Sequence, residues 1–172
     1  FSYWIYDFVF KDLPSPQDLT KKRQIVTTRI LDRNGKLLYR IYKDENRTIV
    51  PLEQIPQHMI NATLAIEDKN FYKHRGFSVK GIFFSFVNNL KEESLQGGST
   101  ITQQLVKNSL LSPEKTIKRK LRELVLSILV EGTFTKDEIL QMYLNEVAYG
   151  GSTYGVEEAA HKYFGKSAKD LT

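Results

Sequence analysis

Apolar residues recur every three or four positions along most of this 172-residue chain. This period places them on one face of a helix. It predicts helices over 57–68, 79–90, 113–130, 135–146 and 156–164, one that begins at Ser99 or Thr100, and one that begins at 167. Strand-like segments over 25–31 and 37–42 flank Asn34-Gly35, a strong hairpin turn, and 48–50 predicts a short third strand. The predicted fold is mainly α with a small N-terminal β-hairpin.

The predicted helix over 113–130 carries an apolar stripe, and proline in its first turn suits a helix start. Ile117, Leu121, Leu124 and Ile128 form the stripe, while Lys115, Arg119, Arg122 and Glu123 lie on the opposite face. Beyond Glu123 the segment is apolar almost all round, so we predict a central buried helix. In the later helices the residues predicted to face inward are Ile139, Leu140, Tyr143, Leu144, Ala159, Ala160 and Phe164.

The first ten residues include six aromatic ones, a composition typical of membrane interfaces. Basic residues at 21–23 could meet anionic lipid headgroups. No apolar run reaches the roughly 18 residues that cross a bilayer. We therefore predict a juxtamembrane arm over 1–24, with an arm packed on its own domain as the alternative. The very apolar helix over 79–90 is either core or dips into lipid, and the aromatic start favours lipid. The chain is expected to be a piece of a longer protein that continues past Thr172.

The net charge of +5 is concentrated in one region. Between Lys107 and Arg122 there are six basic residues and a single acidic one, Glu114. Such a patch favours phosphates, anionic headgroups or nucleic acid, although a solvated helix face is the ordinary explanation. The absence of cysteine excludes disulfides and thiolate chemistry, and the three dispersed histidines argue against a histidine metal site.

Residues 96–108 combine paired glycines, hydroxyls, amides and a lysine. Thr100 and Gln103 have the spacing of a capping box, as do Thr135 and Glu138. Thr100, Gln104 and Lys107 share one helical face, and the unpaired N–H groups of a helix start suit an anion. The segment therefore predicts a binding surface for an anionic ligand. The alternative is an ordinary capped helix after a glycine turn.

Glu67 lies at the end of the helix predicted over 57–68, on the same face as Ile60 and Leu64. Partial desolvation at such an apolar edge makes a carboxylate a better proton acceptor. The alternative is an ion pair between this helix-end acid and Lys69 or Arg75.

Four segments resemble, in order, the motifs of the peptidoglycan glycosyltransferase family (glycosyltransferase family 51), found in class A penicillin-binding proteins and monofunctional glycosyltransferases. Residues 67–76 resemble Glu-Asp-x-x-Phe-x-x-His-x-Gly, 96–104 match Gln-Gly-Gly-Ser-Thr-Ile-Thr-Gln-Gln, 119–123 resemble Arg-Lys-x-x-Glu, and 136–145 resemble the fourth motif. Four ordered motifs are far more specific than one. The chain departs from the family at Phe84-Ser85, where an Arg-Ala pair is usual, and its loop before Gln96 is one residue shorter.

The resemblance implies a lysozyme-like α fold for a domain over 25–172, cut short at its C-terminus, with a membrane-associated jaw lobe around 77–95. It implies polymerisation of lipid II into β-1,4 glycan strands, with inversion and loss of polyprenyl pyrophosphate. The implied location is the outward face of the bacterial inner membrane, with a transmembrane anchor before residue 1. The implied partners are lipid II, the growing strand, the membrane surface and other cell-wall synthesis proteins, without nucleic acid.

By the same resemblance Glu67 is the general base and Asp68 supports it. Lys107, Lys115 and Arg122 hold the donor pyrophosphate, while Ser99, Thr100 and Gln104 position sugar or phosphate. Glu123 either orients the basic cluster or helps to place a divalent cation, Mg²⁺ or Mn²⁺, on the pyrophosphate; no tightly bound cofactor is implied. The rest of the predicted substrate-binding set is Gln103 and Asn108, with Phe71, His74, Arg119, Lys120 and Asn145 as supporting residues.

Two other functions fit parts of this pattern. A lysozyme-like enzyme that cleaves glycan strands would share the fold and one key carboxylate. It would not need the basic patch, because its neutral substrate bond carries no pyrophosphate. A non-catalytic module that docks on anionic membranes would need the patch but not Glu67.

Overall fold

The computed structural model describes residues 2–21, 28–35, 37–41, 46–78 and 98–172. The predicted helix over 79–90, the Phe84-Ser85 departure, and all but the first two residues of the predicted jaw lobe lie outside them. The helices are α1 (Ser2–Val9), α2 (Asp18–Lys21), α3 (Gln57–Glu67), α5 (Ile101–Leu110), α6 (Ile117–Thr133), α7 (Lys136–Glu146) and α8 (Val156–Phe164). Short 3₁₀ turns η2 (Leu52–Gln54), η3 (Phe71–Lys73) and η4 (Ala168–Asp170) and four short strands complete the described chain. The predicted mainly α fold is confirmed.

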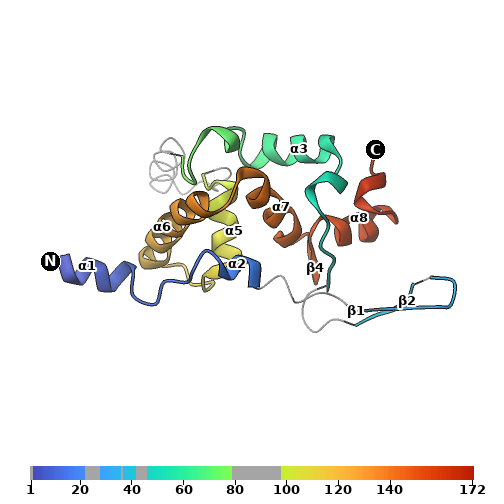
Figure 1. The fold of residues 1–172 in the computed structure, drawn as a ribbon, viewed down its shortest axis with the longest axis horizontal. Coiled ribbons are helices and arrows are strands. Elements are labelled where there is room, and N and C mark those ends of the chain that lie inside the picture. The colour runs from blue at the N-terminus through green and yellow to red at the C-terminus, as the bar shows by residue number, and fades with distance from the viewer. Residues whose placement is uncertain (1, 22–27, 36, 42–45, 79–97) are drawn as a thin grey trace.

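Helix α5 is the centre of the molecule. It lies between α6 and α7, with α3 running above α7 (Figure 1). Ile101, Leu105 and Val106 on α5 are almost completely buried, and they share one core with Ile139, Leu140 and Leu144 of α7. Both helices begin with the predicted capping boxes, at Thr100–Gln103 and Thr135–Glu138. The sequence pattern therefore located the start and the inner face of α7 correctly.

Helix α6 differs from its prediction at both its start and its buried face. Residues 112–116 are not helical, and the helix begins at Ile117, where the Thr116 hydroxyl accepts from the Arg119 N–H at 3.1 Å. Ile117 is 80% exposed, and Leu121 and Ile128 are also exposed, so the predicted stripe is wrong. The buried face consists of Glu123, Leu126, Ser127 and Val130. Two of these are polar, and α6 is a flanking helix rather than the central one.

The C-terminal part follows the prediction less closely at its edges. The predicted helix over 156–164 is confirmed as α8, and Ala159 and Ala160 are buried. Phe164 was predicted to face inward but is 67% exposed. Residues 168–170 form a single 3₁₀ turn where a further α-helix was predicted to begin.

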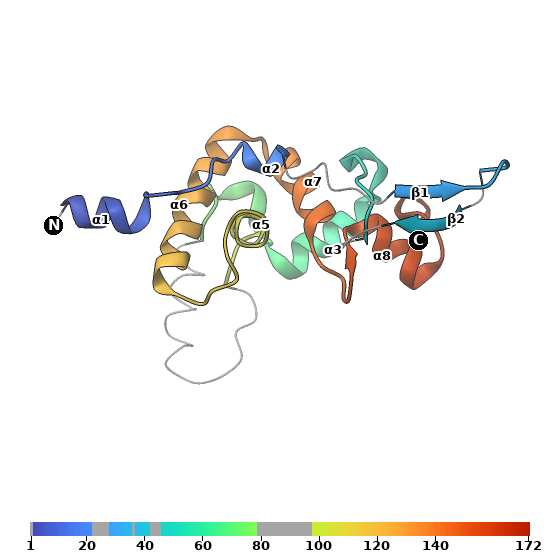
Figure 2. The same cartoon turned by 90° about the horizontal axis from the view of Figure 1, so that it is seen from below.

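Two small sheets accompany the helices. Strands β1 (Thr28–Leu31) and β2 (Leu37–Ile41) pair antiparallel at the end of the molecule opposite to α1 (Figure 2). The predicted third strand over 48–50 is wrong, since β3 is Asn46–Arg47 and pairs parallel with β4 (Thr153–Tyr154). The reason is that the Asn145 side chain of α7 takes both backbone groups of Val50, at 2.9 Å each. The Val50 N–H and C=O are therefore bonded to a side chain instead of to a strand partner.

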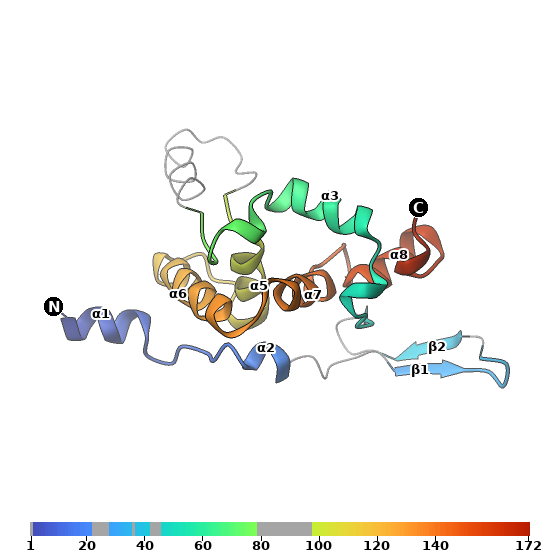
Figure 3. The same cartoon turned by 45° about the horizontal axis from the view of Figure 1, so that its top comes forward.

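The N-terminal arm packs on the domain, which was the alternative for residues 1–24. Helix α1 lies against α6, and α2 lies against α5 (Figure 3). Val9 and Leu19 are buried, and Leu19 belongs to the core. No helix in the described ranges is long and apolar enough to cross a bilayer.

Gly76 fixes the end of the first motif against α6. Its φ is +88°, and an added Cβ would lie 2.7 Å from the backbone oxygen of Ser127. The Thr100 hydroxyl also donates to the Gly76 carbonyl at 2.7 Å, so this glycine joins η3, α5 and α6. A side chain is therefore excluded both by the backbone conformation and by lack of space.

We expect Gly76→Ala to lower the free energy of unfolding by roughly 2–4 kcal/mol, from left-handed strain and overpacking together. Gly132→Ala is the matched control, because its Cβ would meet nothing within 4 Å and it lies inside α6. There alanine should stabilise the helix by about 0.5–1 kcal/mol. Urea denaturation of both variants measures the difference. Equal midpoints for Gly76→Ala and the parent chain would contradict the role of Gly76.

Candidate active site

Glu67 occupies the C-terminal end of α3 and faces α5 and α7. The Gln104 side-chain amide on α5 donates to Glu67 Oε2 at 2.8 Å. The Tyr143 hydroxyl on α7 donates to Gln104 Oε1 at 3.2 Å. Among the described residues, no ion pair involves Glu67, Lys69 or Arg75. The alternative in which Glu67 pairs with a neighbouring base is therefore not what this structure contains.

Two tyrosines, the buried Tyr143 and the half-buried Tyr149, lie near enough to this carboxylate to feel its charge. Burial raises the pKa of the Tyr149 phenol to about 12, and the negative charge of Glu67 adds to the rise. Burial and, after it, the charge of Glu67 also raise the pKa of Tyr143 well above its usual range. Both phenols therefore stay protonated at neutral pH and can act as hydrogen-bond donors. Sequence reasoning missed this role: Tyr143 was assigned to the core by its period, and Tyr149 was not singled out.

Asp68 follows Glu67 and joins α3 to α5. Its Oδ2 accepts from the backbone N–H of Ile101, at the start of α5, at 3.1 Å. The same oxygen accepts from His74 Nε2 at 2.8 Å, while His74 Nδ1 accepts from the Gly76 N–H at 3.2 Å. This pair of bonds assigns the imidazole proton to Nε2. Because Asp68 and His74 are largely buried, they hold the Glu67 end of α3 in place rather than contact a ligand.

Thr100 and Gln103 belong to the architecture, which corrects their predicted substrate contacts. Thr100 accepts from the Gln103 N–H and donates to the Gly76 carbonyl, and the Gln103 side chain accepts from the Thr100 N–H. Both side chains are at least 97% buried. Their polar atoms are thus engaged in the hydrogen bonds that cap the N-terminus of α5 and bind Gly76.

The third motif forms a buried ionic cluster on α6. Glu123 is 1% exposed, and its two oxygens accept from Arg119, at 2.6 Å, and from Lys120. Lys120 also donates to the Ser99 hydroxyl at 3.2 Å, which links the cluster to the residue before the Thr100 cap. Glu123 therefore holds two cations, of which Lys120 reaches the start of α5; this fits the predicted role of orienting the basic cluster.

A divalent cation does not fit at Glu123. Both of its oxygens already accept from cationic side chains. Within the described ranges no group of three or more histidine, cysteine or acidic side chains could hold a metal ion. The donor set beside Glu123 is cationic, and such groups suit phosphate oxygens rather than Mg²⁺ or Mn²⁺.

The Arg122 side chain binds the backbone of the N-terminal arm. Its Nε donates to the Val9 carbonyl at 3.1 Å, and its Nη2 donates to the Lys11 carbonyl. Lys118 lies over the Phe8 ring, 5.5 Å from the centroid. These two side chains of α6 bind the N-terminal arm. The prediction that Arg122 holds pyrophosphate stays a prediction, and in this structure the guanidinium contacts the arm instead.

The other predicted residues divide into exposed and buried ones. Lys107 and Asn108 lie exposed on the last turn of α5, and Lys115 lies exposed in the connection to α6. Lys107 follows Gln104 by three positions and so shares its side of the helix. Phe71 is buried beneath Lys136, and Asn145 is buried against Val50. Phe71 and Asn145 therefore support the fold.

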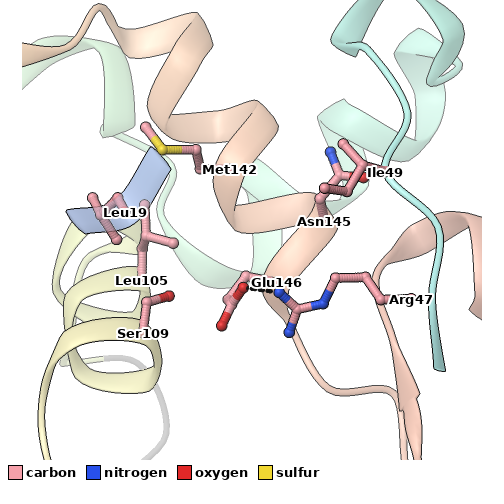
Figure 4. A pocket seen from close by; sticks show the side chains of 8 residues that line it. All are labelled: Leu19, Arg47, Ile49, Leu105, Ser109, Met142, Asn145 and Glu146. Atoms are coloured by element: carbon pink, nitrogen blue, oxygen red, sulfur yellow. Dashed lines mark hydrogen bonds and ion pairs between the residues drawn. The ribbon is translucent and has the colours of Figure 1, made fainter. Parts of the chain in front are cut away.

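A small hollow between α5, α7, β3 and the arm is separate from the Glu67 cluster. Leu19, Arg47, Ile49, Leu105, Ser109, Met142, Asn145 and Glu146 line it (Figure 4). Its volume is about 20 Å³, and the Arg47–Glu146 ion pair lies at its edge. That volume suffices for about one water molecule and not for a sugar.

Comparison with known proteins gives consistent matches. The family model described as "Transglycosylase" matches residues 34–172. Penicillin-binding protein 1A of Rickettsia conorii is 42% identical, over 99% of this chain and 22% of the relative. Penicillin-binding protein 1A of Clostridium tetani is 47% identical, over 83% of this chain and 19% of the relative. The chain thus spans about a fifth of the length of these relatives.

Proposed function

Because the chain belongs to the transglycosylase family, we propose that it is a peptidoglycan glycosyltransferase of bacterial cell-wall synthesis. Its substrate is lipid II, and its product is a β-1,4-linked glycan strand. The observation that carries the proposal is the 2.8 Å contact between Glu67 of the first motif and Gln104 of the second. It joins Glu67, the candidate general base, to the helix that carries Lys107.

In the proposed reaction Glu67 is the general base. Its carboxylate takes the proton from the 4-hydroxyl of the acceptor sugar as that oxygen attacks the anomeric carbon of the donor. The bond from this carbon to the pyrophosphate oxygen breaks, and the electron pair leaves with the polyprenyl pyrophosphate. Attack opposite the leaving group inverts the anomeric carbon. A single carboxylate suffices, because pyrophosphate leaves without needing a protein acid.

The basic side chains stabilise the charge that develops on the leaving group. Lys107 and Lys115 are exposed cations, and Lys120 reaches the Ser99 hydroxyl beside the start of α5. Positive groups near a developing anion lower the barrier, because they stabilise its charge in the transition state. Gln104 and Ser99 position sugar or phosphate. No step is assigned to a metal ion, since Glu123 already accepts from two cations.

The location follows from the substrate. Lipid II is a membrane lipid, so the domain over 25–172 works at the outer surface of the inner membrane. The arm over 1–24 carries the aromatic and basic residues suited to that surface. The proposal includes a transmembrane anchor before residue 1 and association with other cell-wall synthesis proteins.

The proposal is tested by giving the purified chain lipid II in one reaction and purified glycan polymer in another. We expect lipid II to be consumed with growth of polymer, and the polymer to stay intact. Cleavage of polymer without consumption of lipid II would identify a lysozyme-like hydrolase. Binding to anionic vesicles without either reaction would identify a membrane-docking module. Either result overturns the proposal.

A further inference from the structure

The Gln104 side chain is an amide whose two ends have opposite effects on a neighbouring carboxylate. Its NH₂ group attracts the charge of Glu67, while its carbonyl oxygen would repel it. The two ends are nearly equal in shape, so packing alone holds either orientation equally well. A second hydrogen bond is needed to favour one orientation of the amide over the other. In this structure the choice is made at Gln104 Oε1, which accepts from the Tyr143 hydroxyl at 3.2 Å.

Tyr143 is well suited to that choice. Its side chain is 3% exposed on the inner face of α7, in the same core as Leu140 and Leu144. Burial and the nearby Glu67 charge keep its phenol protonated, so it has a proton to donate. A phenol that donates to the amide oxygen leaves the amide N–H groups to point at Glu67 Oε2. The two hydrogen bonds run in the same direction: the phenol donates to the amide, and the amide donates to the carboxylate.

We propose that Tyr143 is a positioning residue that holds the Glu67 carboxylate in its working orientation by fixing the side-chain amide of Gln104. The inference rests on the proposed role of Glu67 as general base. It has a consequence at the level of atoms: Gln104 occupies Oε2, so Oε1 is the oxygen that takes the acceptor proton.

The groups that bear on Glu67 come from three directions. Gln104 lies on α5, and Tyr143 lies on α7 with Tyr149 three positions beyond the end of that helix. Asp68 is adjacent in sequence, but its carboxylate is held by His74 and the Ile101 N–H. Of these, the Gln104 amide is the donor that stabilises the ionised form of Glu67. Loss of its orientation therefore weakens the ionised form.

The first test is Tyr143→Phe, which keeps the ring and removes only the hydroxyl. We expect kcat on lipid II to fall about 5- to 30-fold, the effect of losing one buried hydrogen bond, with KM unchanged. The acid limb of the pH–rate profile should move to higher pH, which a merely structural residue would not cause. Tyr72→Phe is the matched control, because the Tyr72 hydroxyl donates to Asp137 at 2.9 Å, away from Gln104. It should leave rate and profile unchanged.

The second test is a double-mutant cycle with Gln104→Ala. If Tyr143 acts through Gln104, the double variant should be no slower than Gln104→Ala alone. Additive effects, or a Tyr143→Phe variant with the parent rate and pH profile, would overturn the inference. Should Tyr143→Phe fold poorly, the hydroxyl proton of Tyr143 in the parent chain tests the same bond by NMR, since it is the proton donated to Gln104 Oε1. It should be protected from exchange with solvent in the parent chain and lose that protection in Gln104→Ala, and equal exchange in both would overturn the inference.

Glu67→Gln separates this inference from the proposed function. If the Glu67→Gln variant were active, the proposed role of Glu67 as general base would be overturned, and the role of Tyr143 with it. An inactive Glu67→Gln variant beside a fully active Tyr143→Phe variant would leave the base in place and overturn only the role of Tyr143.

Discussion

Glu67→Gln is expected to lower the rate of glycan synthesis by about 10²–10⁴-fold, the contribution of a positioned general base. The amide has nearly the same shape as the carboxylate, and its oxygen can still accept from Gln104 as Glu67 Oε2 does at 2.8 Å. What it cannot do is take the proton from the acceptor hydroxyl. The variant should therefore fold normally and bind the lipid II donor as the parent chain does. Turnover of lipid II and a separate binding titration measure the two properties.

Glu53→Gln is the control for that experiment. Glu53 is an exposed acid in η2, and it takes part in none of the ion pairs described above. Its neutralisation changes the net charge by the same amount as Glu67→Gln but removes no contact of the site. A rate for Glu67→Gln within a few-fold of the Glu53→Gln rate would show that another group takes the proton.

Local signals along the sequence were reliable where the structure depends on neighbours in the chain. The capping boxes at Thr100 and Thr135 depend on residues three positions apart, and both are present. The inner face of α7 follows from its period, because most of its buried side chains are apolar. The resemblance of four ordered segments to one family is likewise a property of the sequence alone, and the family match supports it.

Helix α6 shows why period alone was insufficient. The helix has two candidate faces for burial, and the face that is buried is not the more apolar one. The buried stripe contains Glu123, which is neutralised by Arg119 and Lys120, and Ser127, whose hydroxyl donates to the Glu123 carbonyl at 2.6 Å. A polar residue can be buried when its partners are present. Hydrophobic periodicity does not count those partners, so it chose Ile117 and Ile128 instead.

The site itself depends on contacts between distant residues. Glu67 meets Gln104 across 37 positions, and Gln104 meets Tyr143 across 39. Arg122 is bound by arm residues more than 110 positions earlier in the chain. Helical spacing places each residue on a face but does not say which other helix meets that face. The motifs therefore indicated which residues matter, while the division between ligand contact and architecture needed the fold.

Lys107→Ala is expected to weaken binding of a pyrophosphate-bearing donor by about 5- to 30-fold at low ionic strength, because one charge-assisted contact is lost from a partly solvated position. Lys107 is exposed on the last turn of α5, on the side that carries Gln104. Salt screens such a contact, so the affinity of the variant should fall less steeply with rising salt than that of the parent chain. The measurement is a binding titration at several ionic strengths.

Lys169→Ala is the matched control, since Lys169 is an exposed lysine on η4 and removes the same charge. It should leave both the affinity and its salt dependence unchanged. This comparison separates a direct contact at Lys107 from the general attraction of a chain with net charge +5. If both lysine variants weaken binding equally, the donor is drawn by overall charge. In that case the pyrophosphate is held elsewhere, and Lys120 beside Ser99 is the next cation to test.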